Sequence, residues 1–438
     1  MIRRVCCIMS LLVFLCSGAY SQLHNISFER ISIEQGLSQS TVSSIVQDSL
    51  GYMWFATNEG LNRYDGNNFV NFRYNPKIPK SLPENNITTL FVDRYGTLWV
   101  GTASRGLCKY NQSLNSFENF RNNPMDDKTI SADGITAIYQ DKAGFIWVGT
   151  KNGLNRYDPR RRNFKRYLPN PLDNSSVSSN KINHITGDRL GNLWVSTDYG
   201  LNRFNVYREV FFAYVNRRNV LNKISDNVVN AALVDTGNVV WVATQRGLNK
   251  LDLRTNKFEY FFNDPQDVKS ISANNVTSLL KDKDGLIWIG TINGGLNCFN
   301  PKTKTFKAFL YDPGNSKSLS VNSILDLYTD RSGVLWIGTF LGGINKWNRM
   351  SEGLETYRNN PYDVTSINTN QVQSFYEDSV GNVWIGTVDG GLNFWERNFN
   401  TFVHYAEVPD DSTSLNNMHV TSILRDSENK IFIGTDGG

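Results

Sequence analysis

The four histidines of this chain are the first residues to test for chemistry, because imidazole binds metals and transfers protons near neutral pH. They are His24, His184, His404 and His419. No two of them stand at metal-ligand spacing, and the sequence contains no H-E-x-x-H motif. We interpret each as an ordinary surface or strand histidine.

Aspartate is the most regularly placed reactive residue. One aspartate stands six residues before an aromatic residue in nine copies of a pattern: Asp48, Asp93, Asp141, Asp188, Asp235, Asp282, Asp330, Asp378 and Asp426. A glycosidase needs two carboxyl groups at one place, whereas one aspartate per copy spreads the carboxyl groups around the molecule. The segment DKDG at Asp282–Gly285 looks like the start of a calcium loop, but it lacks the remaining oxygen ligands and the closing glutamate. We therefore predict no catalytic residue, no metal and no cofactor.

The aromatic residue of each copy defines a repeat. It is tryptophan in eight copies and Phe432 in a ninth, the tryptophans being Trp54, Trp99, Trp147, Trp194, Trp241, Trp288, Trp336 and Trp384. Successive copies are 45, 48, 47, 47, 47, 48, 48 and 48 residues apart. Such regular spacing indicates a repeat architecture. Recurrence in every copy favours a structural role for these residues over a place in one active site.

Each repeat predicts four short β-strands. In the third copy they are ITAIYQD, FIWVGT, GLNRYD and NFKRYL, which combine period-two alternation with β-branched and aromatic residues. No copy has an apolar 3.6-residue pattern long enough for a helix. Four antiparallel strands in about 45 residues describe one blade of a β-propeller. We therefore predict an all-β fold of four-stranded antiparallel blades, with the tryptophan as a wedge between blades.

The aspartate and a glycine three residues later predict the hairpin turn between the first two strands, as in Asp141–Gly144. Aspartate accepts hydrogen bonds from turn amides, and glycine adopts positive φ. The fifth copy departs from this pattern, with Gly237 one place early, and the ninth copy has Asn429 instead.

Nine copies exceed the ~4–8 blades of a closed propeller. Residues Phe28–Ile33 look like the last strand of a repeat that has no blade of its own, so seven blades close if this strand completes the blade begun by Ile324–Trp347. The pattern then breaks near Arg349–Gly353. We predict a seven-bladed propeller over residues 22–350 and an incomplete second propeller over residues 351–438. A closed ring of eight or nine blades is the alternative.

The first 21 residues predict a secretory signal peptide, because two arginines precede an apolar stretch and small residues follow it. An uncleaved anchor is the alternative, although the apolar run is shorter than the ~20 residues that a span needs. Without this segment the formal net charge falls from +4 to +2, from 43 basic minus 41 acidic residues. Such a balance gives no reason to expect a nucleic-acid partner.

Two cysteines remain after the signal peptide, Cys108 and Cys298. We place them at equivalent positions of two repeats. A disulfide framework is therefore not expected to stabilise the fold, although an exported compartment permits disulfides.

The connections between the second and third strands are the candidate binding surface. In a propeller they share one face with the connections between blades, and here their sequences vary while their flanks do not. The side chains predicted to project there are Arg105, Lys151, Tyr199, Arg246 and Phe340. Aromatic and basic groups on rigid turns suit a sugar ring and its carboxylate or sulfate, and solvated loop tips are the alternative. A basic cluster at Pro159–Tyr167 is interpreted as a solvated charge run, with contact to an acidic glycan as its alternative.

The segment GLSQSTVSSIVQDSLGYMWFATNEGLNRYDG at Gly36–Gly66, followed by repeats of G-x-[LIV]-W-[VI]-G-T-x-x-G-[GL]-[LN], resembles the two-component regulator propeller. The resemblance extends from about Phe28 to the last residue. It implies the periplasmic sensor region of a hybrid two-component histidine kinase of the Bacteroidetes type, with a phosphorelay, a homodimer and an oligosaccharide ligand. Any membrane contact would come through downstream segments, which this chain lacks. The chain also has no phosphoacceptor-histidine segment and no ATP-binding glycines, so we predict that it is not itself an enzyme.

The resulting prediction is a periplasmic propeller that senses oligosaccharides and regulates polysaccharide use. A free-standing secreted carbohydrate-binding or protein-scaffold propeller is the alternative. A polysaccharide-acting enzyme is the third candidate.

Overall fold

The computed structural model describes residues 26–219, 222–351 and 356–437. The chain divides into two compact units, Met1–Glu352 and Gly353–Gly438, and each is described by itself. The predicted signal peptide and His24 lie outside the described residues. Among the described residues, no helix has the length and apolar character that crossing a membrane requires.

The first unit consists of seven four-stranded antiparallel sheets, which are the predicted blades. Blade one consists of β2 (Val42–Gln47), β3 (Met53–Thr57), β4 (Gly60–Tyr64) and β5 (Phe69–Phe72), and blade two of β6 (Ile87–Val92), β7 (Leu98–Thr102), β8 (Leu107–Asn111) and β9 (Ser116–Phe120). Blade three consists of β10 (Ile135–Gln140), β11 (Ile146–Thr150), β12 (Gly153–Asp158) and β13 (Asn163–Tyr167), and blade four of β14 (Ile182–Gly187), β15 (Asn192–Thr197), β16 (Gly200–Asn205) and β17 (Val210–Tyr214). Blade five consists of β18 (Val229–Asp235), β19 (Val239–Thr244), β20 (Gly247–Asp252) and β21 (Lys257–Phe261). Blade six consists of β22 (Val276–Lys281), β23 (Ile287–Thr291), β24 (Leu296–Asn300) and β25 (Thr305–Phe309). Blade seven consists of β26 (Ile324–Thr329), β27 (Leu335–Thr339), β28 (Ile344–Trp347) and β1 (Glu29–Ile31). Two short 3₁₀ turns, η1 (Ile33–Gln35) and η2 (Arg349–Ser351), complete the described elements of this unit.

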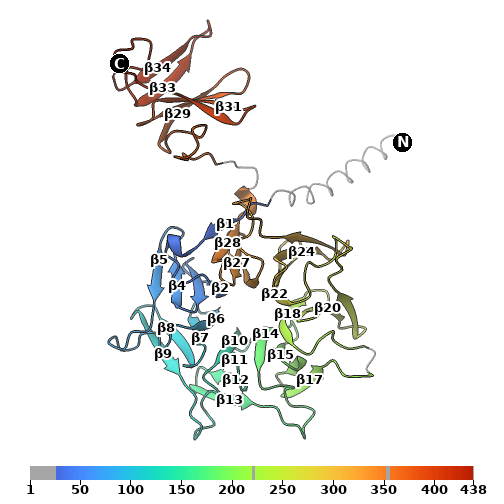
Figure 1. The fold of residues 1–438 in the computed structure, drawn as a ribbon. Coiled ribbons are helices and arrows are strands. Elements are labelled where there is room, and N and C mark those ends of the chain that lie inside the picture. The colour runs from blue at the N-terminus through green and yellow to red at the C-terminus, as the bar shows by residue number, and fades with distance from the viewer. Residues whose placement is uncertain (1–25, 220–221, 352–355, 438) are drawn as a thin grey trace, which may run out of the picture. The chain divides into compact units, whose positions relative to one another are not determined.

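The seven blades form a closed ring (Figure 1). Their first strands lie innermost and contact one another in cyclic order, from β2 through β6, β10, β14, β18, β22 and β26 back to β2. The N-terminal strand β1 pairs with β28, with Ile31 opposite Ile344. It thus supplies the outer strand of the last blade, as predicted. Closure inside one hydrogen-bonded sheet joins the two ends of the ring without leaving a free edge on β28.

Seven apolar clusters fill the seven interfaces between blades. Each cluster contains one of the repeat tryptophans, which packs from its own blade against the next: Trp54, Trp99, Trp147, Trp194, Trp241, Trp288 and Trp336. At the closing interface, the ring of Trp336 lies 5.6 Å from that of Phe55 and 6.2 Å from that of Tyr64. These tryptophans are at most 5% exposed, and a buried side chain of this size contributes about 3–5 kcal/mol. The repeat tryptophans thus pack as wedges between blades.

The repeated aspartate also forms a hydrogen bond to the wedge tryptophan, a role that the sequence analysis did not predict. In the third blade, Asp141 Oδ1 accepts the Phe145 N–H at 3.0 Å and closes the predicted turn. Its other oxygen, Oδ2, accepts the indole N–H of Trp147 at 2.7 Å. Five more blades of the ring form the same indole–carboxylate bond, at 2.7–3.4 Å.

The fifth blade is the exception. Its turn has Gly237 one place early, and Asp235 bonds to Lys281 of the next blade. The indole N–H of Trp241 is buried without a partner. The fifth blade, with its irregular turn, therefore lacks the indole–carboxylate hydrogen bond of the other six blades.

The second unit contains a four-stranded sheet of β29 (Val372–Glu377), β30 (Val383–Thr387), β31 (Leu392–Glu396) and β32 (Thr401–Tyr405), and a two-stranded sheet of β33 (Val420–Arg425) and β34 (Ile431–Thr435). An open apolar cavity of about 370 Å³ lies on the four-stranded sheet, and Phe375, which lines it, is 76% exposed. One complete blade and two strands of another agree with the predicted incomplete second propeller.

Candidate functional site

The turns between second and third strands are tied to the connections between blades, so they share one face of the ring. In every blade, the N–H of a turn glycine donates to the carbonyl two residues before an innermost strand. The seven pairs are Gly60–Asn85, Gly106–Asp133, Gly153–Asn180, Gly200–Asn227, Gly247–Asn274, Gly295–Asn322 and Gly343–Ser40, at 2.6–2.9 Å. These glycines have φ between +67° and +122°, which other residues rarely adopt. We call this surface the turn face.

A buried threonine anchors each turn from inside. In the third blade, Thr150 Oγ1 donates to the Gly153 carbonyl at 3.0 Å and accepts the Asn152 N–H at 3.0 Å. The turn backbone is therefore satisfied internally, and the tip side chains are free of structural work.

All five predicted site residues are exposed on the turn face. Lys151 and Phe340 hold the first place of their turns, and their N–H groups bond to the connection at 3.0 Å and 2.9 Å. Arg105, Tyr199 and Arg246 hold the last place before the glycine, where their N–H groups bond to the anchoring threonine at 3.0–3.1 Å. The five side chains thus share a face but occupy two kinds of position. Their role in binding stays a prediction.

A central channel of about 300 Å³ runs between the innermost strands. In each of these strands the register against the second strand shifts after the first residue, which marks a bulge. A bulge turns one side chain away from the regular alternation. The side chains so directed line the channel and are Ser43, Thr88, Thr136, Asn183, Asn230, Thr277 and Leu325. We call them the bulge ring; none of the five described turn-face candidates lines the channel.

Most of the bulge ring is linked blade to blade. Five members donate to the carbonyl that begins the next innermost strand, at 2.7–2.9 Å. Leu325 has no donor to offer, and Thr136 Oγ1 is buried without a partner. Sequence reasoning missed this ring, although a signal exists: each member stands 11 residues before its tryptophan, as Ser43 does before Trp54.

An aspartate and a histidine also line the channel. Asp326 accepts the N–H groups of Ile45 and Leu327 at 2.8 Å and 2.9 Å, and burial raises the pKa of its carboxyl to about 6. His184 accepts the Ala232 N–H at 3.4 Å, and burial lowers the pKa of its imidazole to about 4. They belong to the seventh and fourth blades, which are not neighbours, so they do not form an acid–base pair.

The remaining histidines have local partners in the second unit. His404 bonds to the Ser366 carbonyl at 2.8 Å, and His419 lies 2.7 Å from Asp436. Within the described residues, no group of three or more His, Cys, Asp and Glu side chains could hold a metal.

The basic cluster does more than carry solvated charge, so that interpretation is incomplete. Arg162 pairs with Glu118 on the preceding blade, and Lys165 pairs with Glu209 on the following one. Arg166 donates to two carbonyls of the connection that enters its own blade, at 2.8 Å each. These contacts brace the outer rim.

The expected equivalence of the two cysteines is wrong. Cys108 stands opposite Val100 on β7, whereas Cys298 stands opposite Trp288 on β23. An offset of one residue turns a strand side chain to the other face of its blade. Both are free, buried thiols, and burial raises the pKa of Cys298 to about 12 and raises that of Cys108 as well.

Eight segments of the chain match the family model described as the two component regulator propeller: residues 36–59, 81–104, 129–152, 176–199, 270–293, 318–340, 366–389 and 414–437. The fifth blade, with its irregular turn, lies between matched segments.

Known proteins agree with this match. The extracellular domain of the putative hybrid two-component system BT3049 from B. thetaiotaomicron is 26% identical with a TM-score of 0.66, covering 94% of this chain and 52% of that one. The corresponding domain of BT4673 from the same organism is 24% identical with a TM-score of 0.60, covering 94% and 52%. Histidine kinase P4 of Formosa agariphila is 39% identical over 69 residues, which are 16% of this chain and 5% of that protein. The chain thus spans about half of the solved structures and a small part of the kinase.

These findings define the class: a β-propeller of the kind that forms the extracellular domain of hybrid two-component systems. More specifically, eight of the nine repeats match the two component regulator propeller family.

Proposed function

We propose that this chain is the periplasmic ligand-sensing region of a hybrid two-component sensor, and that its turn face binds an oligosaccharide released from a polysaccharide. One observation carries the proposal. The seven turns are fixed to the connections by the same backbone bond, while their exposed tips differ in every blade. A rigid backbone that presents variable side chains on one face is suited to recognition, because little conformational entropy is lost on binding.

The turn-face side chains supply the chemistry of sugar recognition. Tyr199 and Phe340 are 45% and 50% exposed and offer rings for packing against a pyranose. Arg105, Lys151 and Arg246 are exposed donors for hydroxyl, carboxylate or sulfate oxygens. No nucleophile–base pair is needed for this role, and the ligand is bound rather than converted.

Signalling in this proposal depends on differential affinity. The sensor acts as a homodimer with at least two arrangements, and an oligosaccharide that binds one arrangement more tightly shifts the population toward it. Phosphoryl transfer belongs to other segments of such a sensor, to which the periplasmic propellers are coupled across the inner membrane.

The test is calorimetric titration of the purified chain with a panel of oligosaccharides from plant and algal polysaccharides. Replacing Tyr199 or Arg246 with alanine is expected to weaken binding of the selected ligand about tenfold, as loss of one charged or stacking contact does. The matched controls are Tyr207→Ala and Arg254→Ala, in the same two blades but in the turns at the other end of the strands. Equal loss in the controls would show that the turn face is not the site, and a shortened oligosaccharide product would favour an enzyme.

A further inference from the structure

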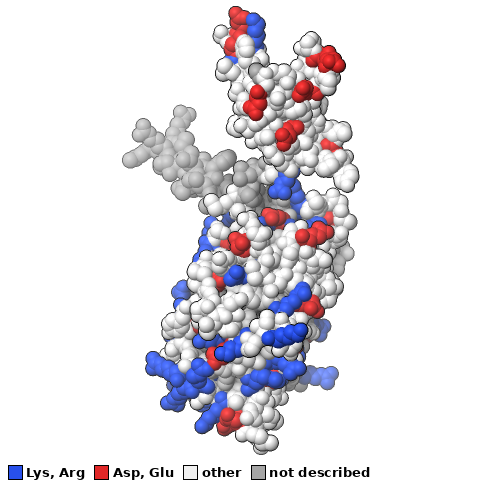
Figure 2. Space-filling model, turned by 90° about the vertical axis from the view of Figure 1, so that its left-hand side faces the viewer, with Lys and Arg blue, Asp and Glu red and all other residues white. Residues whose placement is uncertain are grey.

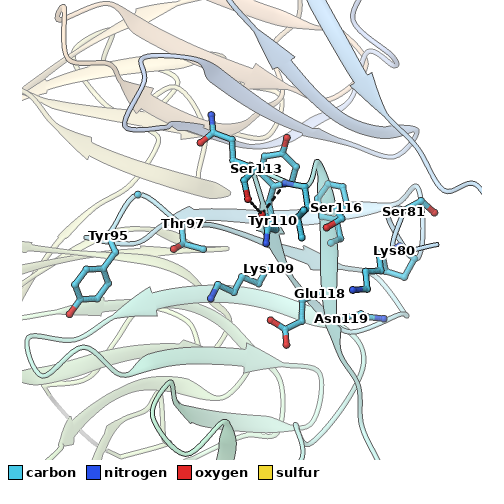
Figure 3. Close-up of a pocket in the computed structure, with 16 residues that line it drawn as sticks. Lys80, Ser81, Tyr95, Thr97, Lys109, Tyr110, Ser113, Ser116, Glu118 and Asn119 are labelled. Carbon is cyan, nitrogen blue, oxygen red and sulfur yellow. Dashed lines mark hydrogen bonds between the residues drawn. The ribbon is translucent and has the colours of Figure 1, made fainter. Parts of the chain in front are cut away.

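A groove of about 1010 Å³ lies on the outer rim of the second blade (Figure 3). It is lined by β8 and β9, the turn between them, the turn between β6 and β7, and residues 80–83 of the connection that enters the blade. The two turns lie at the ends of the strands opposite to the turn face. The groove is therefore separate from the surface of the proposed function.

Beside the groove, a small residue stands where the two neighbouring blades carry a ring. In the first and third blades an aromatic side chain covers the basic residue of the third strand: Tyr52 over Arg63 at 4.7 Å, and Phe145 over Arg156 at 4.8 Å. The second blade has Thr97 at that place. Its N–H donates to a side-chain oxygen of the turn aspartate, as the corresponding N–H does in the other two blades. Its basic residue, Lys109, lies 5.9 Å from the ring of Trp99 and lines the groove.

The groove carries positive charge that its own residues do not neutralise. Lys109 and Lys80 lie on either side of Glu118 (Figure 3). Glu118 stands opposite Lys109 in the strand register, but its carboxylate pairs with Arg162 of the third blade. Among the described residues, neither lysine forms an ion pair. Two ammonium groups are therefore available for an anionic ligand.

The remaining lining suits a polyhydroxylated ligand. Amide and hydroxyl side chains predominate, among them Gln112, Ser113 and Asn119. Tyr95, at one end of the groove, is 76% exposed and offers a ring face (Figure 3). The volume is at the upper end of the range for ligand sites, about 300–1,000 Å³, which suits several sugar rings.

A peptide fits this groove less well. Peptides commonly bind by adding a strand to an exposed sheet edge. Here the edge of β9 is already engaged, because the Phe117 N–H donates to the Lys80 carbonyl at 2.8 Å.

We propose that this rim groove binds an anionic oligosaccharide, with Lys80 and Lys109 contacting its carboxylate or sulfate groups and Tyr95 packing against a sugar ring. Lysine and arginine side chains gather on this side of the first unit, which favours the approach of such a ligand (Figure 2). The inference rests on the proposed function for the ligand class, and it adds a second site to it.

The test is calorimetric titration of the purified chain with two anionic probes, trigalacturonate and a chondroitin 6-sulfate tetrasaccharide. Methyl-esterified trigalacturonate is the neutral match. Lys109→Gln and Lys80→Gln are each expected to weaken binding of an anionic probe about tenfold. Thr97→Tyr places in the groove the residue that the first blade already has there, and it is expected to abolish this binding. Lys257→Gln, at an exposed position of the fifth blade, is the control and leaves binding unchanged.

The outcomes separate this inference from the proposed function. Loss of binding in the groove variants, with the neutral probe inactive and the unfolding temperature retained, supports the groove. Binding that survives Thr97→Tyr but is lost in Tyr199→Ala overturns the groove and leaves the turn-face proposal standing. Binding lost in Thr97→Tyr and retained in Tyr199→Ala supports the groove as a second site, separate from the turn face. Absence of binding to both anionic probes overturns the inference.

Discussion

Replacing Trp147 or Trp241 with phenylalanine compares two wedges that differ in one hydrogen bond. Both are almost fully buried, at 0% and 2% exposure. Each also has a basic side chain 5.8 Å from its ring, Arg156 in one case and Lys250 in the other. The substitution removes the same indole atoms in both and leaves a similar cavity, which costs about 1–3 kcal/mol. That cost cancels when the two variants are compared.

The difference comes from the turn aspartate. Trp147→Phe removes the donor that Asp141 Oδ2 accepts at 2.7 Å and leaves a buried carboxylate oxygen with one partner fewer. A hydrogen bond to a charged group contributes about 1.5–3 kcal/mol. Trp241→Phe removes an N–H that has no partner, so it loses no such bond. We expect Trp147→Phe to lower the free energy of unfolding by about 2 kcal/mol more than Trp241→Phe does.

The assay is urea unfolding followed by circular dichroism, with a double-mutant cycle in each blade. The coupling energy between Asp141 and Trp147 is expected near 2 kcal/mol, and that between Asp235 and Trp241 near zero, on the same scale of about 1.5–3 kcal/mol for a charged bond. Equal costs of the two Trp→Phe substitutions, or equal couplings in the two blades, would refute the reasoning.

Three further predictions concern the ring interior. Thr88→Val loses a 2.7 Å bond to the next blade and should cost about 1 kcal/mol, whereas Thr136→Val removes a hydroxyl without a partner and should cost nothing or stabilise in the same urea assay. Gly149→Ala places a Cβ 2.7 Å from a neighbouring side-chain carbon and should lower the unfolding temperature, while Gly237→Ala, with nothing within 4 Å, should change it little; equal effects would contradict the packing argument. Burial raises the pKa of Asp326 to about 6 from 3.8, so the folded state keeps a proton that the unfolded state releases. The free energy of unfolding should therefore fall as pH rises from 4 to 6, by roughly 2–3 kcal/mol, and Asp326→Asn should lack this fall in unfolding measured across that range.

The architecture was predictable because the sequence repeats a local pattern of residues with a nearly fixed period. One aspartate and one aromatic residue per repeat indicate the turn and the wedge, because both recur at a fixed spacing. Even the closure by β1 was predictable, since a fourth strand without a blade must complete another sheet. The positions of Tyr199 and Arg246 on strand-two-to-three turns followed from the same periodicity.

Only the tertiary structure decided the rest, because it depends on contacts between blades. Ser43 and Thr277 recur at a fixed distance before their tryptophans, but only the register of the two strands shows that a bulge turns these side chains to the axis. The Trp241 indole N–H has no partner because the side chain of Asp235 bonds to a residue of the next blade instead, and the sequence does not show that contact. The groove beside Thr97 depends on what surrounds this residue in three dimensions, and a single small residue in a turn sequence does not indicate an unfilled volume. The sequence by itself determined the four-stranded blade and its repetition. The packing of one blade against the next determined where the channel and the groove lie and which of the described charged side chains form no ion pair.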